Sequence, residues 1–307
     1  NMKKKLLGLV ACVATLALSG ALLAGCSGSG DKTGGDSANG KETLTVGFDQ
    51  SYPPYGFVGD DGKFTGFDLD LAQAVCDKNG WELKLSAIDW DAKDALLAQG
   101  NINCIWNGFT MEGREDGYTF SDPYMLNEQV IVVKAGSDIS DFAGLSGKTV
   151  MTQVDSAALD VLEGDQAEVA ATFKGGAAQT IGDYNTAFMQ LESGAVDAVA
   201  CDLSIAQYQL AAKPDEYVQL DSGMIDAVAC DLSIAQYQIA ANPDKYVQLS
   251  TPLSTEHYAV GFKKGDTELA QKVTETLKQL DADGTVKQLC EKYSSYGISY
   301  DNWVLGK

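Results

Sequence analysis

The chain has 307 residues and a formal net charge of −21 at pH 7, with 43 acidic residues against 22 basic ones. A protein this acidic is poorly suited to binding nucleic acid or an anionic membrane surface, so we expect no nucleic-acid partner. The same charge disfavours an anionic substrate, unless a local positive site overrides it.

The first 41 residues have the pattern of a lipoprotein leader followed by a tether. Three lysines, an apolar run over 6–23 and the sequence Leu-Ala-Gly before Cys26 resemble a signal peptide, residues 1–25, that is cut at a bacterial lipobox. We expect Cys26 to be lipidated and residues 26–41, rich in Gly, Ser, Asp and Asn, to form a flexible tether. A transmembrane anchor over the same apolar run is the alternative.

The first part of the body alternates between predicted strands and helices. The strands are expected at 44–48, 82–86 and 102–106, with helices capped by Asp68 and beginning near Asp91. This alternation predicts a parallel α/β sheet. Ligands of such sheets bind beyond the carboxyl ends of the strands, where residues 49–55 and 107–114 would lie.

A second α/β pattern follows, so the body is expected to form two lobes. The expected elements are strands at 128–134, 149–153, 169–173, 196–201 and 258–262, and helices at 156–162, 183–192, 269–280 and 285–293.

Residues 191–219 and 220–248 form a tandem repeat with 23 identities in 29 positions. Each copy contains an apolar strand that ends in an aspartate, Asp202 in the first copy and Asp231 in the second. Only one of the two can occupy a given place in a sheet. We favour Asp202, because the helix that leads into its strand is intact and local, and we keep Asp231 as the alternative.

Arg114 is the only arginine in the chain, and the other 21 basic residues are lysines. A guanidinium can hold two carboxylate or phosphate oxygens at once, which lysine cannot do. Arg114 is therefore a candidate anion clamp. A surface or interdomain salt bridge is the alternative.

The five cysteines beyond Cys26 show no metal-ligand spacing, and His257 is the only histidine. We therefore predict buried thiols and neither a metal nor a cofactor.

Several motifs together resemble the polar amino-acid substrate-binding proteins of ABC importers, which are solute-binding protein family 3 with the type II periplasmic-binding fold. These motifs are Val-Gly-Phe-Asp-Gln-Ser-Tyr-Pro-Pro-Tyr-Gly-Phe (46–57), Phe-Thr-Gly-Phe-Asp-Leu-Asp-Leu-Ala (64–72), Trp-Asn-Gly-Phe-Thr with Gly-Arg-Glu (106–115), Phe-Ser-Asp-Pro-Tyr (120–124), Val-Asp-Ala-Val-Ala-Cys-Asp (196–202) and Asp-Gly-Thr (283–285).

The resemblance implies an α/β fold with two doubly wound sheets joined by a two-strand hinge, with crossover strands near 129–134 and 256–262. Lobe 1 would comprise 42–130 and 260–307, and lobe 2 would comprise 131–259. The lobes would close on the ligand by hinge bending.

The resemblance also implies a ligand site, position by position. Arg114 would bind the α-carboxylate, with Thr110 and the backbone of Gly108 as further donors. Asp202, or Asp231, would bind the α-ammonium group. The remaining contacts would be Asp49, Tyr52, Trp90, Gln153 and Ser156.

Some of these positions have alternative roles, and one departs from the family pattern. Tyr52 and Trp90 could be core aromatics, Asp49 could cap a turn, and Ser156 could cap a helix. Where many relatives have a glycine-threonine turn, this chain has Asp155 before Ser156, which adds a carboxylate near the site.

The implied function is that of a monomeric receptor, lipid-anchored on the outer face of the bacterial cytoplasmic membrane. It would capture a polar α-amino acid and deliver it to the permease and ATPase of an ABC importer. The alternative is a dehydratase-like enzyme on the same fold, with Asp155 or Glu112 as the acid–base group. The sequence shows no histidine-based or paired-carboxylate constellation that supports either residue, so we expect a binding protein.

Overall fold

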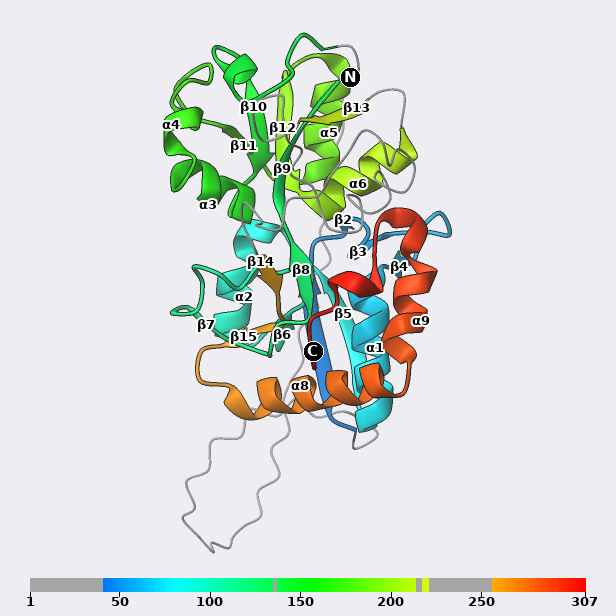
Figure 1. The fold of residues 1–307 in the computed structure, drawn as a ribbon. Coiled ribbons are helices and arrows are strands. Elements are labelled where there is room, and N and C mark those ends of the chain that lie inside the picture. Colours follow the sequence, from blue (N-terminus) through cyan, green and yellow to red (C-terminus); the bar gives the residue numbers. More distant parts are fainter. Residues whose placement is uncertain (1–40, 135–136, 214–216, 221–255) are drawn as a thin grey trace, which may run out of the picture. The chain divides into compact units, whose positions relative to one another are not determined.

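The computed structural model describes residues 41–134, 137–213, 217–220 and 256–307, and it contains two five-stranded sheets (Figure 1). The signal segment, Cys26, the tether up to residue 40, Cys230, Asp231 and the second repeat copy beyond Leu220 lie outside these residues. No helix among the described residues is long and apolar enough to cross a bilayer.

The first sheet has the strand order β5-β1-β6-β15-β7. Its strands are β1 (Thr43–Phe48), β5 (Glu82–Ala87), β6 (Cys104–Ile105), β7 (Tyr118–Phe120) and β15 (Gly261–Lys263). β1 runs parallel to β5 and β6, so the predicted parallel α/β sheet is confirmed for this part of the chain. β15 returns late in the sequence and pairs antiparallel with β6 and β7.

Helices from both ends of the chain accompany this sheet. They are α1 (Phe67–Asn79), η1 (Trp90–Ala92), α2 (Lys93–Gln99), α8 (Thr267–Ala282), α9 (Thr285–Lys292), η3 (Ser294–Tyr296) and η4 (Tyr300–Asn302). The predicted cap of α1 is wrong, because Gly66 and not Asp68 precedes the helix. The Asp68 carboxylate instead accepts hydrogen bonds from the Gly108 N–H at 2.6 Å and the Tyr124 hydroxyl at 2.9 Å.

The second sheet has the order β11-β10-β12-β9-β13. Its strands are β9 (Gln129–Lys134), β10 (Val150–Gln153), β11 (Gln179–Ile181), β12 (Ala198–Asp202) and β13 (Tyr217–Leu220). The accompanying helices are η2 (Ala143–Leu145), α3 (Ala157–Glu163), α4 (Ala167–Ala170), α5 (Tyr184–Ser193) and α6 (Leu203–Ala212). The first repeat copy supplies β12, α6 and most of β13, so Asp202 occupies the end of a central strand.

The strand predicted at 169–173 is wrong. Residues 167–170 form α4 instead, and the strand beside β10 is β11, further along the chain. Three alanines among residues 167–171 favour helix, and this local propensity outweighs the β-branched and aromatic residues that suggested a strand.

Two short antiparallel strands, β8 (Met125–Asn127) and β14 (Glu256–Tyr258), form the hinge between the lobes. The predicted strand at 258–262 is therefore split between β14 and β15. The first crossover lies at β8, earlier than expected, because 129–134 already belongs to the second sheet. A small sheet of β2 (Ser51–Tyr52), β3 (Gly56–Val58) and β4 (Phe64–Thr65) follows β1.

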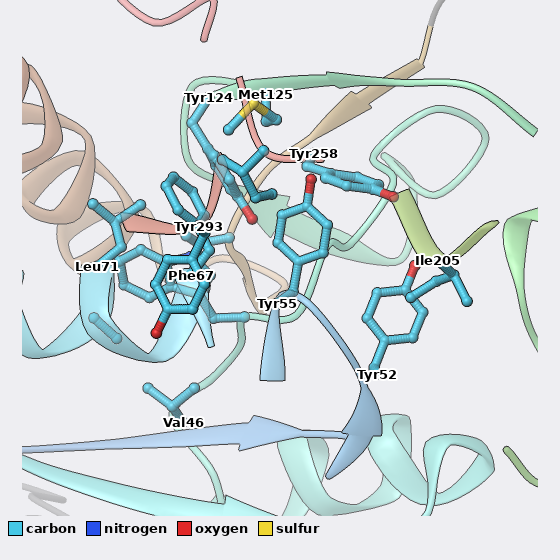
Figure 2. Packing of buried hydrophobic residues seen from close by; sticks show 14 of the residues in the cluster. Val46, Tyr52, Tyr55, Phe67, Leu71, Tyr124, Met125, Ile205, Tyr258 and Tyr293 are labelled. Atoms are coloured by element: carbon cyan, nitrogen blue, oxygen red, sulfur yellow. The ribbon is translucent and has the colours of Figure 1, made fainter. Parts of the chain in front are cut away.

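Aromatic side chains fill the core beside the hinge (Figure 2). Tyr55 makes edge-to-face contacts with Tyr258, at a centroid distance of 5.1 Å, and with Phe67, at 6.1 Å. Tyr52 and Ile205 belong to the same buried cluster and extend it to α6 of the second lobe. Edge-to-face pairs fix ring positions as well as burying area, so this packing holds Tyr55 in place. The Tyr52 ring packs against Tyr55 at 6.2 Å and against Tyr184 at 5.9 Å in tilted arrangements.

Candidate functional site

The residues predicted to bind a ligand lie at the carboxyl ends of strands in both sheets. Asp49 and Tyr52 follow β1, Gly108 and Thr110 follow β6, Gln153 ends β10, and Asp202 ends β12. Such strand ends are where open α/β sheets bind ligands. Polar contacts between the two lobes there include a hydrogen bond between Asp49 and Gln153 and two larger groups. We call these groups the hinge network, which comprises Tyr52, Asn127, Gln129, Asp202, Glu256 and Tyr258, and the Arg114 cluster, which comprises Trp90, Lys93, Arg114, Asp155 and Asp160.

The hinge network surrounds the Asp202 carboxylate, whose residue is 3% exposed. The Tyr52 hydroxyl donates to Oδ2 at 2.5 Å, while Asn127 Nδ2 at 2.9 Å, Gln129 Nε2 at 2.6 Å and the Tyr258 hydroxyl at 3.1 Å donate to Oδ1. Burial raises the pKa of Asp202, although these hydrogen bonds oppose the rise. Since all four donors are neutral, the charged carboxylate is favoured further by any cation that reaches it.

Glu256, which the sequence analysis did not identify, is the second carboxyl group of the hinge network. Its Oε2 accepts from Gln129 Nε2 at 2.9 Å, from Asn127 Nδ2 at 3.2 Å and from the Thr110 hydroxyl at 3.5 Å. Burial, and then the nearby Asp202 charge, raise the pKa of Glu256 to about 7. The available signal in the sequence was an acidic residue just before the apolar run of the second crossover, residues 258–262.

Asp49 contributes a third buried carboxyl group, on the side of β10. Gln153 Nε2 donates to its Oδ2 at 2.7 Å, and the Ser51 N–H donates to its Oδ1 at 2.8 Å. Asp49 therefore caps a turn, as the alternative prediction had it, and also contacts the second lobe. Burial raises the pKa of Asp49 to about 6.

The Arg114 cluster joins the lobes by charged contacts. Arg114 Nη2 lies 2.6 Å from Asp160 Oδ2 and also donates to the Asp155 carbonyl at 3.4 Å, while Nη1 donates to the Thr110 carbonyl at 3.2 Å. The structure thus contains the interdomain salt bridge that was kept as the alternative for Arg114. Its partner, the Asp160 side chain, is 60% exposed.

Trp90 and a buried lysine complete the Arg114 cluster. Trp90 Nε1 donates to the Asp155 carbonyl at 3.2 Å, and Lys93 Nζ lies 3.2 Å from Asp155 Oδ2. Lys93 is 3% exposed, and its Nζ also donates to the Trp90 carbonyl at 3.4 Å. The sequence did not indicate this residue, because its charged partner Asp155 is distant in the chain. Asp155 has a positive φ of 54°, which a glycine would adopt with less strain.

The other predicted contacts are already engaged within the protein. The Gly108 N–H, expected as a ligand donor, donates to Asp68 at 2.6 Å. Ser156 Oγ accepts from the Leu159 N–H at 3.2 Å and so caps α3, which was its alternative role. Tyr52 and Trp90 are both buried, and each has its polar atom bonded to the second lobe.

Comparison with known proteins gives a consistent result. The family model for bacterial extracellular solute-binding proteins, family 3, matches residues 44–296. The L-cystine-binding protein TcyJ of Escherichia coli (strain K12) is 28% identical over 254 residues, which is 82% of each chain.

Solved structures are also similar. A substrate-binding protein of an ABC uptake transporter from Streptococcus pneumoniae with bound histidine has a TM-score of 0.70 and 30% identity, covering 84% of this chain and 94% of its own. The arginine-, lysine- and histidine-binding protein ArtJ from Geobacillus stearothermophilus has a TM-score of 0.65 and 27% identity, covering 82% and 95%. These likenesses agree with the two-lobed fold described above.

Proposed function

We propose that this chain, which belongs to family 3 of the bacterial extracellular solute-binding proteins, captures a polar α-amino acid between its lobes and delivers it to an ABC importer. The observation that carries the proposal is the Asp202 carboxylate, which is buried and bonded by neutral donors from both lobes and the hinge. Similar proteins are named for binding cystine, histidine, arginine or lysine, which supports an amino acid as the ligand.

The α-ammonium group would bind at Asp202 Oδ2. That oxygen accepts one described hydrogen bond, from Tyr52, whereas Oδ1 already accepts three. A buried carboxylate without a cation is costly, and an ammonium group with good hydrogen bonds offsets that cost. Asp202 is on the second lobe and Tyr52 on the first, so a ligand held by both favours closure.

The α-carboxylate would bind to Arg114 in place of Asp160. The exchange keeps the same type of ion pair, since one carboxylate replaces another on the same guanidinium. It also costs little folding free energy, because ion pairs with an exposed partner such as Asp160 contribute little to stability.

The remaining predicted contacts would shape the pocket for the ligand's side chain. We propose that Tyr52 and Trp90 cover it, and that Asp49, Thr110, Gln153 and Ser156 lie at its polar edge. The sequence predicted lobe boundaries at 42–130 with 260–307 and at 131–259. We propose the same division with the first boundary moved to the end of β8, because Gln129 and Val130 belong to β9 of the second sheet.

Membrane attachment would come from the leader. A lipid on Cys26 and a tether over 26–41 would hold a monomer on the outer face of the cytoplasmic membrane, next to the permease and its ATPase. The lipobox-like sequence supports this proposal.

Binding is favoured over catalysis. Relatives are named as binding proteins, and the two residues offered as acid–base groups have other partners. Asp155 is paired with Lys93 at 3.2 Å, and Glu112 with His257 Nδ1 at 2.7 Å.

Calorimetry of the purified protein against the twenty amino acids and cystine tests the proposal, with Asp202→Ala and Asp231→Ala as a matched pair. We expect tight binding that Asp202→Ala abolishes and Asp231→Ala leaves intact. If a cooperatively folded protein binds none of these compounds, the proposal is wrong.

A further inference from the structure

Two carboxyl groups in the hinge network share the same two amide groups. Asn127 Nδ2 and Gln129 Nε2 each donate to Asp202 Oδ1 and also to Glu256 Oε2. Each amide nitrogen carries two hydrogens and donates one to Asp202 and the other to Glu256. The two carboxyl oxygens therefore face each other across the amides, and Asp202 depends on Glu256 for the orientation of two of its donors.

The side-chain carbonyl of Gln129 supplies a separate observation. Gln129 Oε1 is buried and has no hydrogen-bond partner within the part of the chain that the structure describes. A buried acceptor without a donor is unfavourable. A protonated carboxyl group beside the same amide would supply the missing donor, because an acid and a primary amide can form two hydrogen bonds with each other.

Two acidic neighbours favour keeping a proton on Glu256. They are Asp202 at the end of β12 and Glu112, which is paired with His257. The phenols of Tyr52 and Tyr258 donate to Asp202 and so favour its charged form. No lysine or arginine among the described residues is hydrogen-bonded to either carboxyl group. Burial accordingly raises the pKa of both Asp202 and Glu256.

We propose that Glu256 is a positioning residue of the ammonium site, that it and Asp202 hold one proton between them in the unliganded protein, and that the incoming ammonium group releases this proton to solvent. This inference rests on the proposed function for the identity of the ligand group. The proton leaves because a positive charge at Asp202 stabilises the ionised form of its neighbour. Glu256 acts through Asn127, Gln129 and Asp202, without touching the ligand.

The sign of the resulting pH dependence follows by linkage. The unliganded site binds a proton that the liganded site does not, so affinity rises as pH rises toward the pKa of the free protein, which is about 7 for Glu256. Above that pH the pair is already ionised, and the affinity becomes constant. Between pH 5.5 and 7.5 we expect affinity to increase roughly tenfold.

The first experiment needs no ligand. The full chain, labelled with ¹³C at the glutamate carboxyl carbons, is titrated from pH 4 to 9 by NMR. We expect one resonance that titrates near pH 7, that is missing in Glu256→Gln, and that remains in the control Glu163→Gln, an exposed glutamate at the end of α3. Titration of Glu256 in the range of ordinary glutamates would overturn the inference.

The second experiment is calorimetry with L-arginine, L-lysine, L-glutamine and L-cystine at pH 6.5, in buffers of different ionisation enthalpy. Their side chains do not titrate between pH 5.5 and 7.5. For any of them that binds, we expect release of at least about half a proton per ligand from the unmodified protein. Glu256→Gln should still bind, with clearly less proton release and a clearly smaller rise of affinity with pH than the unmodified protein.

The two proposals fail in different ways. Binding without proton release, or equal release from Glu256→Gln, would refute the shared proton and leave the receptor function standing. Absence of binding by all twenty amino acids and cystine would refute the receptor function, while the titration of unliganded protein would still decide whether Glu256 holds the proton.

Discussion

The hinge network and the Arg114 cluster join the same two lobes by opposite electrostatic means. The hinge network buries the carboxyl groups of Asp202 and Glu256 among neutral donors. The Arg114 cluster pairs opposite charges, and its Asp160 and Asp155 side chains are at least half exposed. The carboxyl groups of the hinge network therefore lack a positively charged partner, whereas the cations of the Arg114 cluster are already paired. The ammonium group of a zwitterion would bind at the hinge network, and its carboxylate would replace Asp160 at Arg114.

The largest expected effect is that of Asp202→Asn. The amide oxygen can still accept from Asn127 and Gln129, but the negative charge is gone, so we expect ligand affinity to fall by about 100-fold or more. Because burial disfavours the charged carboxylate, the midpoint of thermal unfolding at pH 7 should not decrease. Calorimetry and thermal denaturation measure the two effects, and binding that survives would place the ammonium group elsewhere.

The unliganded protein should become less stable as pH rises from 5.5 to 7.5. Three buried carboxyl groups, Asp49, Asp68 and Glu256, have pKa values raised by burial to about 6, 7 and 7. The folded state thus keeps protons that the unfolded state has lost, and the stability they provide disappears as pH passes through those values. We expect a loss of roughly 4 kcal/mol in the free energy of unfolding, measured by urea titration. A rise in stability over this range would contradict the burial of these groups.

Arg114→Lys tests whether the fork geometry or only the charge matters in the Arg114 cluster. Lysine keeps one positive charge but loses the bidentate arrangement, so ligand affinity should fall roughly tenfold. The free energy of unfolding should change by less than about 1 kcal/mol, because Asp160 is exposed. Unchanged affinity would mean that Arg114 serves only as an interlobe salt bridge.

The smallest expected effect is that of Asp160→Asn, which removes the anion that competes for Arg114. Ligand affinity should rise by about twofold to fivefold, consistent with the small free energy of an exposed pair. Asp138→Asn is the matched control, since it removes the similarly exposed partner of Lys148. Equal effects of the two variants would show that Asp160 does not compete with the ligand.

The sequence predicted the general position of the site better than its internal connections. Strand ends identify where Asp49, Asp202 and Gln153 lie, because alternating strands and helices determine which ends meet. The partners of Glu256 and Lys93 are on segments 127 and 62 residues away, and no local pattern encodes such pairs. For the same reason Asp68 looked like a helix cap, although its carboxylate is used by a distant backbone amide.

Local rules also failed where two propensities competed. The segment 169–173 combines alanines with β-branched and aromatic residues, and the helical preference prevailed. The choice between Asp202 and Asp231 rested on chain connectivity, and the structure has Asp202 in the sheet while Asp231 lies outside the described residues.

The fluorescence of Trp90 should report whether the two lobes are open or closed. Its N–H is bonded to the Asp155 carbonyl of the opposite lobe, so separation of the lobes would expose this ring to water. The other three tryptophans, Trp81, Trp106 and Trp303, are buried within the first lobe and supply a constant background. Intrinsic emission should therefore shift to longer wavelength when the lobes open, and a Trp90→Phe variant should lose the shift.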